Sequence, residues 1–349
     1  MAVGTNMSVN IRDIAKAAGV SVSTVSKALN GYSSVNEATR AKVLRIVEEL
    51  RYEPNAAARA LVGQRSMTLG VFLTTGLAHP FFGSLLGGVD RALQEKGYDL
   101  IYLAQAQIGP EYSLVRHCRT RNVEGVLVFG FQETDRNFSE LVEADLPAVF
   151  IDLDIKGSRI GMVTSDNAEA TREAVGHLHA LGHRRIAYLA GLKGSYVEKH
   201  RKRGFRQGLA DHGLADYPDY AVGDDFTQSS GYEAMNRLLA LEERERPTAV
   251  VCCSDLSALG AMDAASERGL AIPDDISIVG FDDIEAARGM RPALTTIRQD
   301  MPRMGYEAVT LLDRLITEEP EPASEAEKQV VLPTEWVSRD SCGPAPGAE

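Results

Sequence analysis

The chain has 349 residues, of which 44% are hydrophobic and 25% charged, and its formal net charge is -12. This length and composition allow a full hydrophobic core and predict two or three domains. The acidic excess argues against a protein coated all over for nucleic acid or anionic lipid. No apolar stretch approaches the roughly 20 residues that cross a bilayer, and the first ten residues lack the pattern of a signal peptide. We therefore expect a cytoplasmic protein with no membrane partner.

The first sixty residues contain three short helical patterns with little space between them. Apolar residues recur at the spacing of one helix face over residues 11–18, and Gly19 ends this helix. Ser21 then caps a second helix over residues 22–30, and Asn36 caps a third. Three helices of this size share one small core, which predicts a separate domain over residues 9–54.

The second of these helices leaves small polar and basic side chains on its outward face. A helix, a glycine-containing turn and a second helix form the helix-turn-helix pattern, in which the second helix reads base edges in the major groove. Residues 1–61 carry eight basic and five acidic side chains, a net charge of +3, which leaves -15 for the rest of the chain. This asymmetry favours phosphate contacts by the N-terminal domain alone. On pattern alone, a helical cap with a solvated basic face explains these residues about equally well.

A proline, an asparagine cap and little more than one alanine-rich turn follow over residues 52–61. Such a helix is too short to be stable alone in water. It would form only when something pins it, as two copies packed together over DNA would do. We therefore expect a hinge helix and linker over residues 55–66.

The stretch from IRDIAKAAGVS to NAAARAL, residues 11–61, resembles the DNA-binding headpiece and hinge helix of the lactose-repressor (LacI/GalR) family of bacterial transcription factors. The resemblance implies that Val22, Ser23 and Lys27 read the major groove. It also implies that Leu61 is an apolar wedge, which kinks the duplex at the central minor-groove step. At Lys27 the family usually has arginine, whose planar fork is more selective for guanine. The other expected DNA contacts are Thr24, Ser26, Asn30, Asn55 and Ala58.

From residue 67 onward, short β-rich apolar runs alternate with helical segments, which predicts parallel sheets with helices on both faces. We expect an effector-binding core over residues 67–342, with a ligand in the cleft between two lobes. The expected parts are an N-terminal lobe (67–164 and 301–332), a C-terminal lobe (165–300 and 333–342) and a flexible tail (343–349).

Short polar and acidic residues stand directly after several of the predicted strands. Together with Arg201, at a predicted helix start, such carboxylates could grip vicinal hydroxyls or a base edge by paired hydrogen bonds. Each of them could instead cap the helix that follows, and for any single residue the two interpretations are about equally favoured. These polar residues are Asp152, Ser254, Asp255, Asp282 and Asp283.

The resemblance to the LacI/GalR family continues to about residue 340, through LGHRRIA at 181–187, SDLSALG at 254–260 and SIVGFDD at 277–283. It implies an α/β fold in which a helix-turn-helix headpiece precedes a two-lobed periplasmic-binding-protein-like effector domain with two doubly wound parallel sheets. The chain departs from the family at Ser254 and His79, where asparagine is frequent. The implied effector residues are the anchors Arg201 and Asp282, the supporting Asp152, Ser254 and Gln299, and the wall residues His79, Phe81 and Phe82.

Metal and enzyme chemistry find little support in the sequence. His177, His179 and His183 lie close together in the sequence, and His179 and His183 have the four-residue spacing of zinc-binding helices. Gly182 is expected to end the helix before His183, however, and no cysteine or carboxylate completes a metal site. The phosphate-binding GxxxxGK[ST] loop, the dinucleotide-binding GxGxxG and the hydrolase GxSxG are absent. We expect no metal, no cofactor and no enzymatic activity.

The most consistent interpretation is a repressor that binds a palindromic operator as a homodimer and is switched by a small molecule, expected to be a sugar. Helix-turn-helix dimers need two half-sites, and the tail lacks the apolar heptads that would join dimers into a tetramer. The alternative is a sugar- or nucleoside-binding or -processing protein that uses the same cleft. A transporter's solute-binding protein would share the two lobes, but it would carry a signal peptide and no headpiece.

Overall fold

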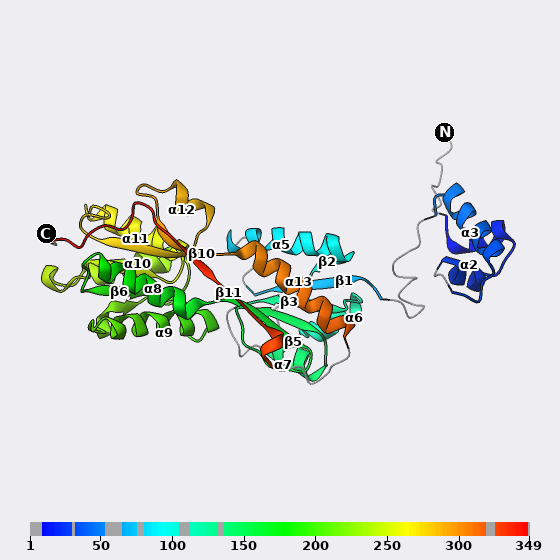
Figure 1. Cartoon of the computed structure of the whole chain (residues 1–349), viewed down its shortest axis with the longest axis horizontal. Coiled ribbons are helices and arrows are strands. Elements are labelled where there is room, and N and C mark those ends of the chain that lie inside the picture. Colours follow the sequence, from blue (N-terminus) through cyan, green and yellow to red (C-terminus); the bar gives the residue numbers. More distant parts are fainter. Residues whose placement is uncertain are drawn as a thin grey trace. The chain divides into compact units, whose positions relative to one another are not determined.

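The computed structural model describes residues 9–29, 32–52, 65–74, 80–104, 112–130, 136–318 and 325–347. The chain divides into two units, Met1–Ser66 and Met67–Glu349, each with its own hydrophobic core. Figure 1 shows the small helical unit and the larger α/β unit.

The first unit is a three-helix headpiece built from α1 (Ile11–Ala18), α2 (Val22–Leu29) and α3 (Glu37–Glu49). The Asn10 side chain accepts the Arg12 N–H at 2.9 Å, and the Asp13 carboxylate accepts the Asn10 N–H, so a capping box starts α1. Gly19 ends this helix in a left-handed conformation (φ 67°), which glycine adopts without strain. The helix-turn-helix prediction is confirmed.

The second unit contains two sheets, each with six strands among the described residues. The strands of the N-terminal lobe, all parallel, are β1 (Thr68–Leu73), β2 (Asp99–Tyr102), β3 (Gly125–Phe129), β4 (Ala148–Ile151), β5 (Ile160–Ser165) and β11 (Gln329–Leu332), in the order β11-β5-β4-β3-β1-β2. The strands of the C-terminal lobe are β6 (Ile186–Leu189), β7 (Ala221–Val222), β8 (Ala249–Cys252), β9 (Ser277–Asp282), β10 (Thr295–Gln299) and β12 (Thr334–Val337), in the order β12-β10-β9-β8-β6-β7. Only β12 runs antiparallel to its neighbour.

Helices cover both sheets. Those of the N-terminal lobe are α5 (Pro80–Lys96), α6 (Leu114–Thr120), α7 (Arg136–Glu143) and α13 (Met301–Thr317). Those of the C-terminal lobe are α8 (Asn167–Ala180), α9 (Tyr196–Asp211), α10 (Gln228–Leu239), α11 (Asp255–Glu267) and α12 (Glu285–Gly289). Because helices lie on both faces, β3, β4 and β5 are buried along their whole length, and β3 and β4 read as unbroken apolar runs. No helix in the described part of the chain is long and apolar enough to span a membrane.

The chain passes between the lobes three times. It leaves the N-terminal lobe from β5 into α8, returns from β10 into α13, and leaves again from β11 into β12. We call these segments the first, second and third crossovers. The polypeptide that joins the lobes is therefore also the polypeptide that forms the strand ends at the cleft.

The expectation of a flexible tail needs correction for the tail residues that the structure describes. The Ala345 N–H donates to the Leu181 carbonyl, and the Gly343 carbonyl bonds to the His183 ring at 3.1 Å. Ser341 is fully buried, and its hydroxyl donates to the Ile278 carbonyl. Gly and Pro content predicted flexibility, but these backbone hydrogen bonds fasten residues 341–345 to the C-terminal lobe.

Helices α5 and α13 lie side by side in the N-terminal lobe, as Figure 1 shows. Their backbones approach at two glycines. A Cβ atom on Gly88 would lie 1.6 Å from the Pro302 carbonyl oxygen, and one on Gly305 would lie 2.1 Å from the Leu85 carbonyl oxygen. Any side chain at either position would force the helices apart.

We expect Gly88→Ala to destabilise the fold by about 2 kcal/mol or more, because overpacking against backbone cannot relax by side-chain rotation. Gly87 is the matched control: it lies on the same helix, and a Cβ there meets no atom within 4 Å. Gly87→Ala should be neutral or stabilise by about 0.5–1 kcal/mol. Denaturant unfolding of both variants measures the difference, and equal stabilities would contradict the close helix packing.

Candidate functional site

The N-terminal end of α2 presents the headpiece residues expected to contact bases. Val22 is 40% exposed, and Ser23 and Lys27 are also exposed, whereas Val25 is fully buried. The Ser21 hydroxyl accepts the Thr24 N–H at 3.1 Å and lies 2.9 Å from the Ser23 hydroxyl. Ser21 therefore caps the helix and orders its first turn. The other expected DNA residues of α2 are Thr24 and Ser26, which are partly buried, while Asn30, Asn55, Ala58 and Leu61 lie outside the described residues.

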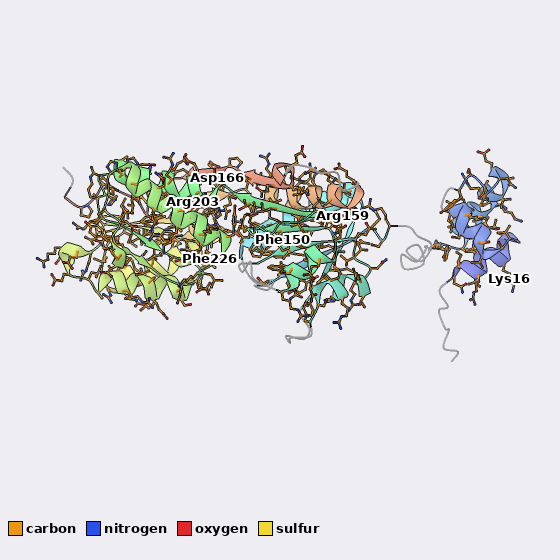
Figure 2. All side chains as sticks on the ribbon, turned by 90° about the horizontal axis from the view of Figure 1, so that it is seen from below. Lys16, Phe150, Arg159, Asp166, Arg203 and Phe226 are labelled. Carbon is orange, nitrogen blue, oxygen red and sulfur yellow. The ribbon has the colours of Figure 1, made fainter. Side chains whose placement is uncertain are left out.

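A cavity of about 330 Å³ lies between the two lobes of the second unit. Figure 2 labels one lining residue, Phe226, on the C-terminal lobe. Among the described residues, the lining is Phe81, Phe129, Asp152, Val197, Arg201, Phe226, Ser254, Asp282 and Gln299.

Arg201 is the only cationic side chain among the described residues of this lining. It lies inside α9, which begins at Tyr196, so the predicted helix start at Arg201 was wrong by five residues. Its Nε donates to Asn167 Oδ1 at 2.8 Å, a second nitrogen donates to the Cys253 carbonyl, and the guanidinium lies 3.6 Å from the centre of the Phe281 ring. With only 4% exposure, the group is fixed on several sides.

Two side chains at strand ends stand next to this guanidinium. Asp282, the last residue of β9, has its Oδ1 3.9 Å from an Arg201 nitrogen. Gln299, the last residue of β10, donates from Nε2 to the same carboxylate oxygen at 2.7 Å. The Gln299 Oε1 is buried and has no hydrogen-bond partner among the described residues. This oxygen is therefore a hydrogen-bond acceptor that a ligand in the cavity could use.

A chain of hydrogen bonds links the anchors of the two lobes. The Thr164 hydroxyl donates to Asp152 Oδ1 at 2.6 Å, and the Asn167 Nδ2 donates to the Thr164 hydroxyl at 3.2 Å and to the Ser165 carbonyl at 3.0 Å. Because Asn167 also accepts from Arg201, its amide joins both sides of the cleft through the first crossover. Sequence reasoning missed Thr164 and Asn167, although both lie at the predicted boundary between the lobes, which follows residue 164.

The polar residues that follow β8 and β9 divide between two tasks. Ser254 lines the cavity, but its hydroxyl also caps α11 by accepting the Ser257 N–H at 3.1 Å and donates to the Phe226 carbonyl. Asp255 is buried and accepts from the Ile284 N–H, and Asp283 pairs with arginines. The capping interpretation is therefore correct for Ser254 without removing it from the cavity, whereas Asp255 and Asp283 do not line it.

Aromatic side chains form the apolar part of the lining. Phe81 stacks on Phe129 with ring centroids 5.4 Å apart, and both line the cavity. Phe82 does not line it, but packs behind Phe129 at 6.0 Å as a support. Phe129 was missed although it ends β3, at the strand edge where a site was expected. His79, the remaining expected wall residue, lies outside the described residues.

Burial controls the charges in this cavity. Burial raises the pKa of Asp282 to about 7, although Arg201 opposes the rise. Burial also raises the pKa of Asp152 against the hydrogen bond from Thr164. Both carboxylates are therefore harder to ionise than an exposed aspartate, although Arg201 opposes this for each of them.

The histidines that suggested a metal site have other contacts. His183 is fully buried, and its ring bonds to the hydroxyls of Thr248 and Ser277. His177 packs on Trp336, and His179 stacks on His212. Among the described residues, no three histidine, cysteine or acidic side chains gather as a metal site.

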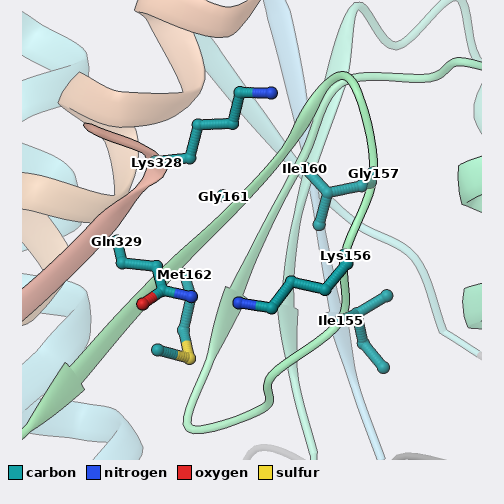
Figure 3. Close-up of a pocket in the computed structure, with 8 residues that line it drawn as sticks. All are labelled: Ile155, Lys156, Gly157, Ile160, Gly161, Met162, Lys328 and Gln329. Carbon is teal, nitrogen blue, oxygen red and sulfur yellow. The ribbon is translucent and has the colours of Figure 1, made fainter. Parts of the chain in front are cut away.

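A second cavity, of about 260 Å³, lies in the N-terminal lobe (Figure 3). The Lys156 ammonium lies 2.8 Å from Asp154, and the Lys328 ammonium donates to the Ser158 carbonyl. Figure 3 shows the ends of Lys156 and Gln329 pointing toward one another. The second cavity differs from the cavity between the lobes in one respect: among its described lining residues no buried side-chain atom lacks a hydrogen-bond partner, whereas Gln299 Oε1 does.

Comparison with known proteins identifies the chain. Residues 10–55 match the family described as bacterial regulatory proteins, lacI family, and residues 175–342 match a periplasmic binding protein-like domain. The probable HTH-type transcriptional repressor ExuR of Bacillus subtilis (strain 168) is 36% identical over 95% of this chain and 98% of its own. The chain belongs to the lacI family of bacterial regulatory proteins.

Solved structures agree with this assignment. A lac repressor dimer bound to operator and the anti-inducer ONPF has a TM-score of 0.76 and 29% identity, covering 96% of this chain and 99% of that one. A complex of the transcriptional regulator CelR with cellobiose has a TM-score of 0.69 and 31% identity, covering 95% and 99%. This lacI-family protein is therefore a transcriptional repressor with an effector-binding core, and its relatives are repressors rather than enzymes.

The raised pKa of Asp282 makes folding stability depend on pH. The folded state holds a proton up to about pH 7, whereas an ordinary aspartate releases it near 3.8. Stability from this group is therefore lost as the pH rises from about 4 to about 7. Asp282→Asn cannot titrate, so the unfolding temperature of wild type should fall relative to this variant across that range. Thermal unfolding at about pH 4 and at about pH 7 measures the difference in unfolding temperature between Asp282→Asn and wild type. A difference that is larger at the acid pH would contradict the raised pKa of Asp282.

Proposed function

We propose that this repressor binds a palindromic operator as a homodimer in the cytoplasm and that a neutral, hydroxyl-rich small molecule, a sugar, controls this binding. The observation that supports the effector class is the composition of the cavity between the lobes. Asp152, Asp282 and the Gln299 Oε1 offer hydrogen-bond acceptors, against the single guanidinium of Arg201. A ligand that completes this set must bring several donors, and sugar hydroxyls do so.

The same charges argue against an acidic effector. A carboxylate or phosphate would face two buried carboxylates and, among the described lining residues, one arginine, whose charge Asp282 already balances from 3.9 Å. Uncompensated negative charge in a buried site is costly. CelR, which was solved with cellobiose, is a relative with a neutral sugar ligand.

The exposed end of α2 supports the proposed DNA contacts. Val22 is apolar yet 40% exposed, and an apolar side chain at this position can contact a thymine methyl group. Ser23 and Lys27 are also exposed, lie four residues apart on α2, and add a hydroxyl and an ammonium. The lac repressor structure with operator contains a dimer, and two headpieces would read the two halves of a palindrome.

A thermal-shift panel tests the effector class. Neutral sugars such as cellobiose, galactose and ribose should include one that raises the unfolding temperature by several degrees, since a ligand at 100 times its Kd stabilises by about 2.7 kcal/mol. Glucuronate, galacturonate and glucose 6-phosphate should not. Nucleosides belong in the panel because Phe81 and Phe129 could also stack a base. A shift with acidic sugars alone would reject the proposed class.

Two matched variants assign the shift to this cavity. Gln299→Met removes the unpaired acceptor and should abolish the ligand-induced shift. Gln329→Met makes the same change at the second cavity, in the N-terminal lobe, and should leave it intact. Equal behaviour of the two variants would place the ligand elsewhere.

Lys27 is expected to read one symmetric pair of operator positions. Selection of binding sites from random duplexes should give a relaxed preference at that pair for Lys27→Ala, with a loss of about 1–3 kcal/mol on the wild-type site. Lys42→Ala is the control, because Lys42 is also exposed and carries the same charge but lies on α3. It should leave the selected sequence unchanged. An identical selected sequence for Lys27→Ala would remove this residue from the readers.

A further inference from the structure

Asp283 follows the proposed effector anchor Asp282 directly, but its carboxylate does not line the cavity. Its side chain is 1% exposed and pairs with three arginines from different elements. A buried carboxylate with this many cationic partners, one residue from the ligand site, needs a physical reason.

The three arginines grip both oxygens of the Asp283 carboxylate. Arg298 on β10 donates from Nε to Oδ2 at 2.7 Å, and Arg288 on α12 approaches the same oxygen at 3.3 Å. Arg339, which follows β12, donates to Oδ1 and also to the Leu294 carbonyl. Burial alone would raise the pKa of Asp283, but the hydrogen bonds from Arg339 and Arg298 hold it below its usual value. The carboxylate is therefore ionised and fixed.

The backbone at this point is strained. Asp282 has φ 125° and Asp283 has φ 58°, both in the region that favours glycine. Residues with side chains keep such conformations only where surrounding contacts over-determine them. Around Asp283, the three arginines supply these contacts.

We propose that Asp283 is a positioning residue for effector binding, whose three-arginine clamp holds the strained turn that keeps the Asp282 carboxylate in the cavity beside Gln299. The importance of this position for ligand affinity rests on the proposed function. The placement of Asp282 itself does not, and it can be tested without any ligand.

The clamp also reaches two of the three crossovers. Arg298 directly precedes Gln299 and the second crossover. Arg339 lies beyond the third crossover, on the segment fastened to the C-terminal lobe. Arg298 additionally pairs with Glu335 on β12 at 2.8 Å. A change in lobe arrangement that moved these strands would pull on Asp283 and, through the turn, on Asp282.

The test separates the clamp from the backbone conformation. Asp283→Gly adopts the left-handed conformation freely but removes the carboxylate, and Asp283→Asn also tolerates this conformation but removes the charge. Arg339→Gln leaves the turn's own residues intact and removes one arm. The readout is the pH titration of the Asp282 carboxylate by ¹³C NMR in the ligand-free full-length chain, with the signal assigned by Asp282→Asn.

In Asp283→Gly, we expect the Asp282 carboxylate to leave Gln299 and its pKa to fall from about 7 toward the usual range for aspartate. Arg339→Gln and Asp283→Asn should cause smaller shifts in the same direction. An unchanged Asp282 titration in Asp283→Gly would overturn the proposal and reduce the clamp to a fastening of the C-terminal segment. Should that variant not fold, an unchanged titration in Arg339→Gln overturns it equally.

Asp145 provides a matched control. It also has a positive φ (50°) and an arginine partner, Arg159 at 3.8 Å, but it lies in the N-terminal lobe and is 57% exposed. Asp145→Gly should leave the Asp282 titration unchanged. If no sugar stabilises the wild-type protein, the proposed effector class fails, while the ligand-free result still decides whether Asp283 positions Asp282.

Discussion

The buried guanidinium of Arg201 is the group on which the rest of the cleft depends. An isolated cation at 4% exposure would be costly, so each of its neighbours must compensate. The Cys253 carbonyl and the Asn167 amide accept from it, and the face of Phe281 covers it. Asp282 stands 3.9 Å away, a separation that provides charge balance without closing a direct hydrogen bond. The guanidinium is therefore oriented by neutral groups and keeps hydrogen-bonding capacity for a ligand.

This arrangement connects ligand occupancy to the movement of the lobes. Asn167 begins α8 immediately after the first crossover, and Gln299 ends β10 immediately before the second. Their hydrogen bonds to Arg201 and Asp282 make the crossover geometry part of the site geometry. A ligand can shift the lobe arrangement only as far as it prefers one arrangement over another. A ligand that contacts Asn167 or Gln299 would therefore favour one arrangement of the lobes, because these side chains belong to both the site and the crossovers.

Much of this architecture could be predicted from the sequence, because it rests on local patterns. The glycine that ends α1 and the apolar runs of the strands each follow from nearest neighbours along the chain. The roles of Asp282 and Asp283 could not be separated in this way, because both follow the same strand and only tertiary contacts show that one lines the cavity while the other meets three arginines. Asn167 was missed for the same reason, since its partners are 34 residues away or across a crossover. The anchored tail depends on Leu181 and His183, far upstream in the sequence.

Charge asymmetry explains why a modest change in the core can govern DNA binding. Residues 1–61 carry only +3, while the remaining chain carries -15 and is repelled by phosphates. Electrostatic attraction supplies most non-specific affinity for DNA, so little of it is available to a chain with this distribution. In the proposed homodimer, tight binding would then come from base contacts made by two headpieces together. Because base contacts would supply most of the affinity, the free energy of operator binding would exceed the minimum needed for occupancy only slightly. A coupling free energy of about 1–3 kcal/mol, typical of allosteric proteins, would then suffice to move the repressor between the bound and the free state.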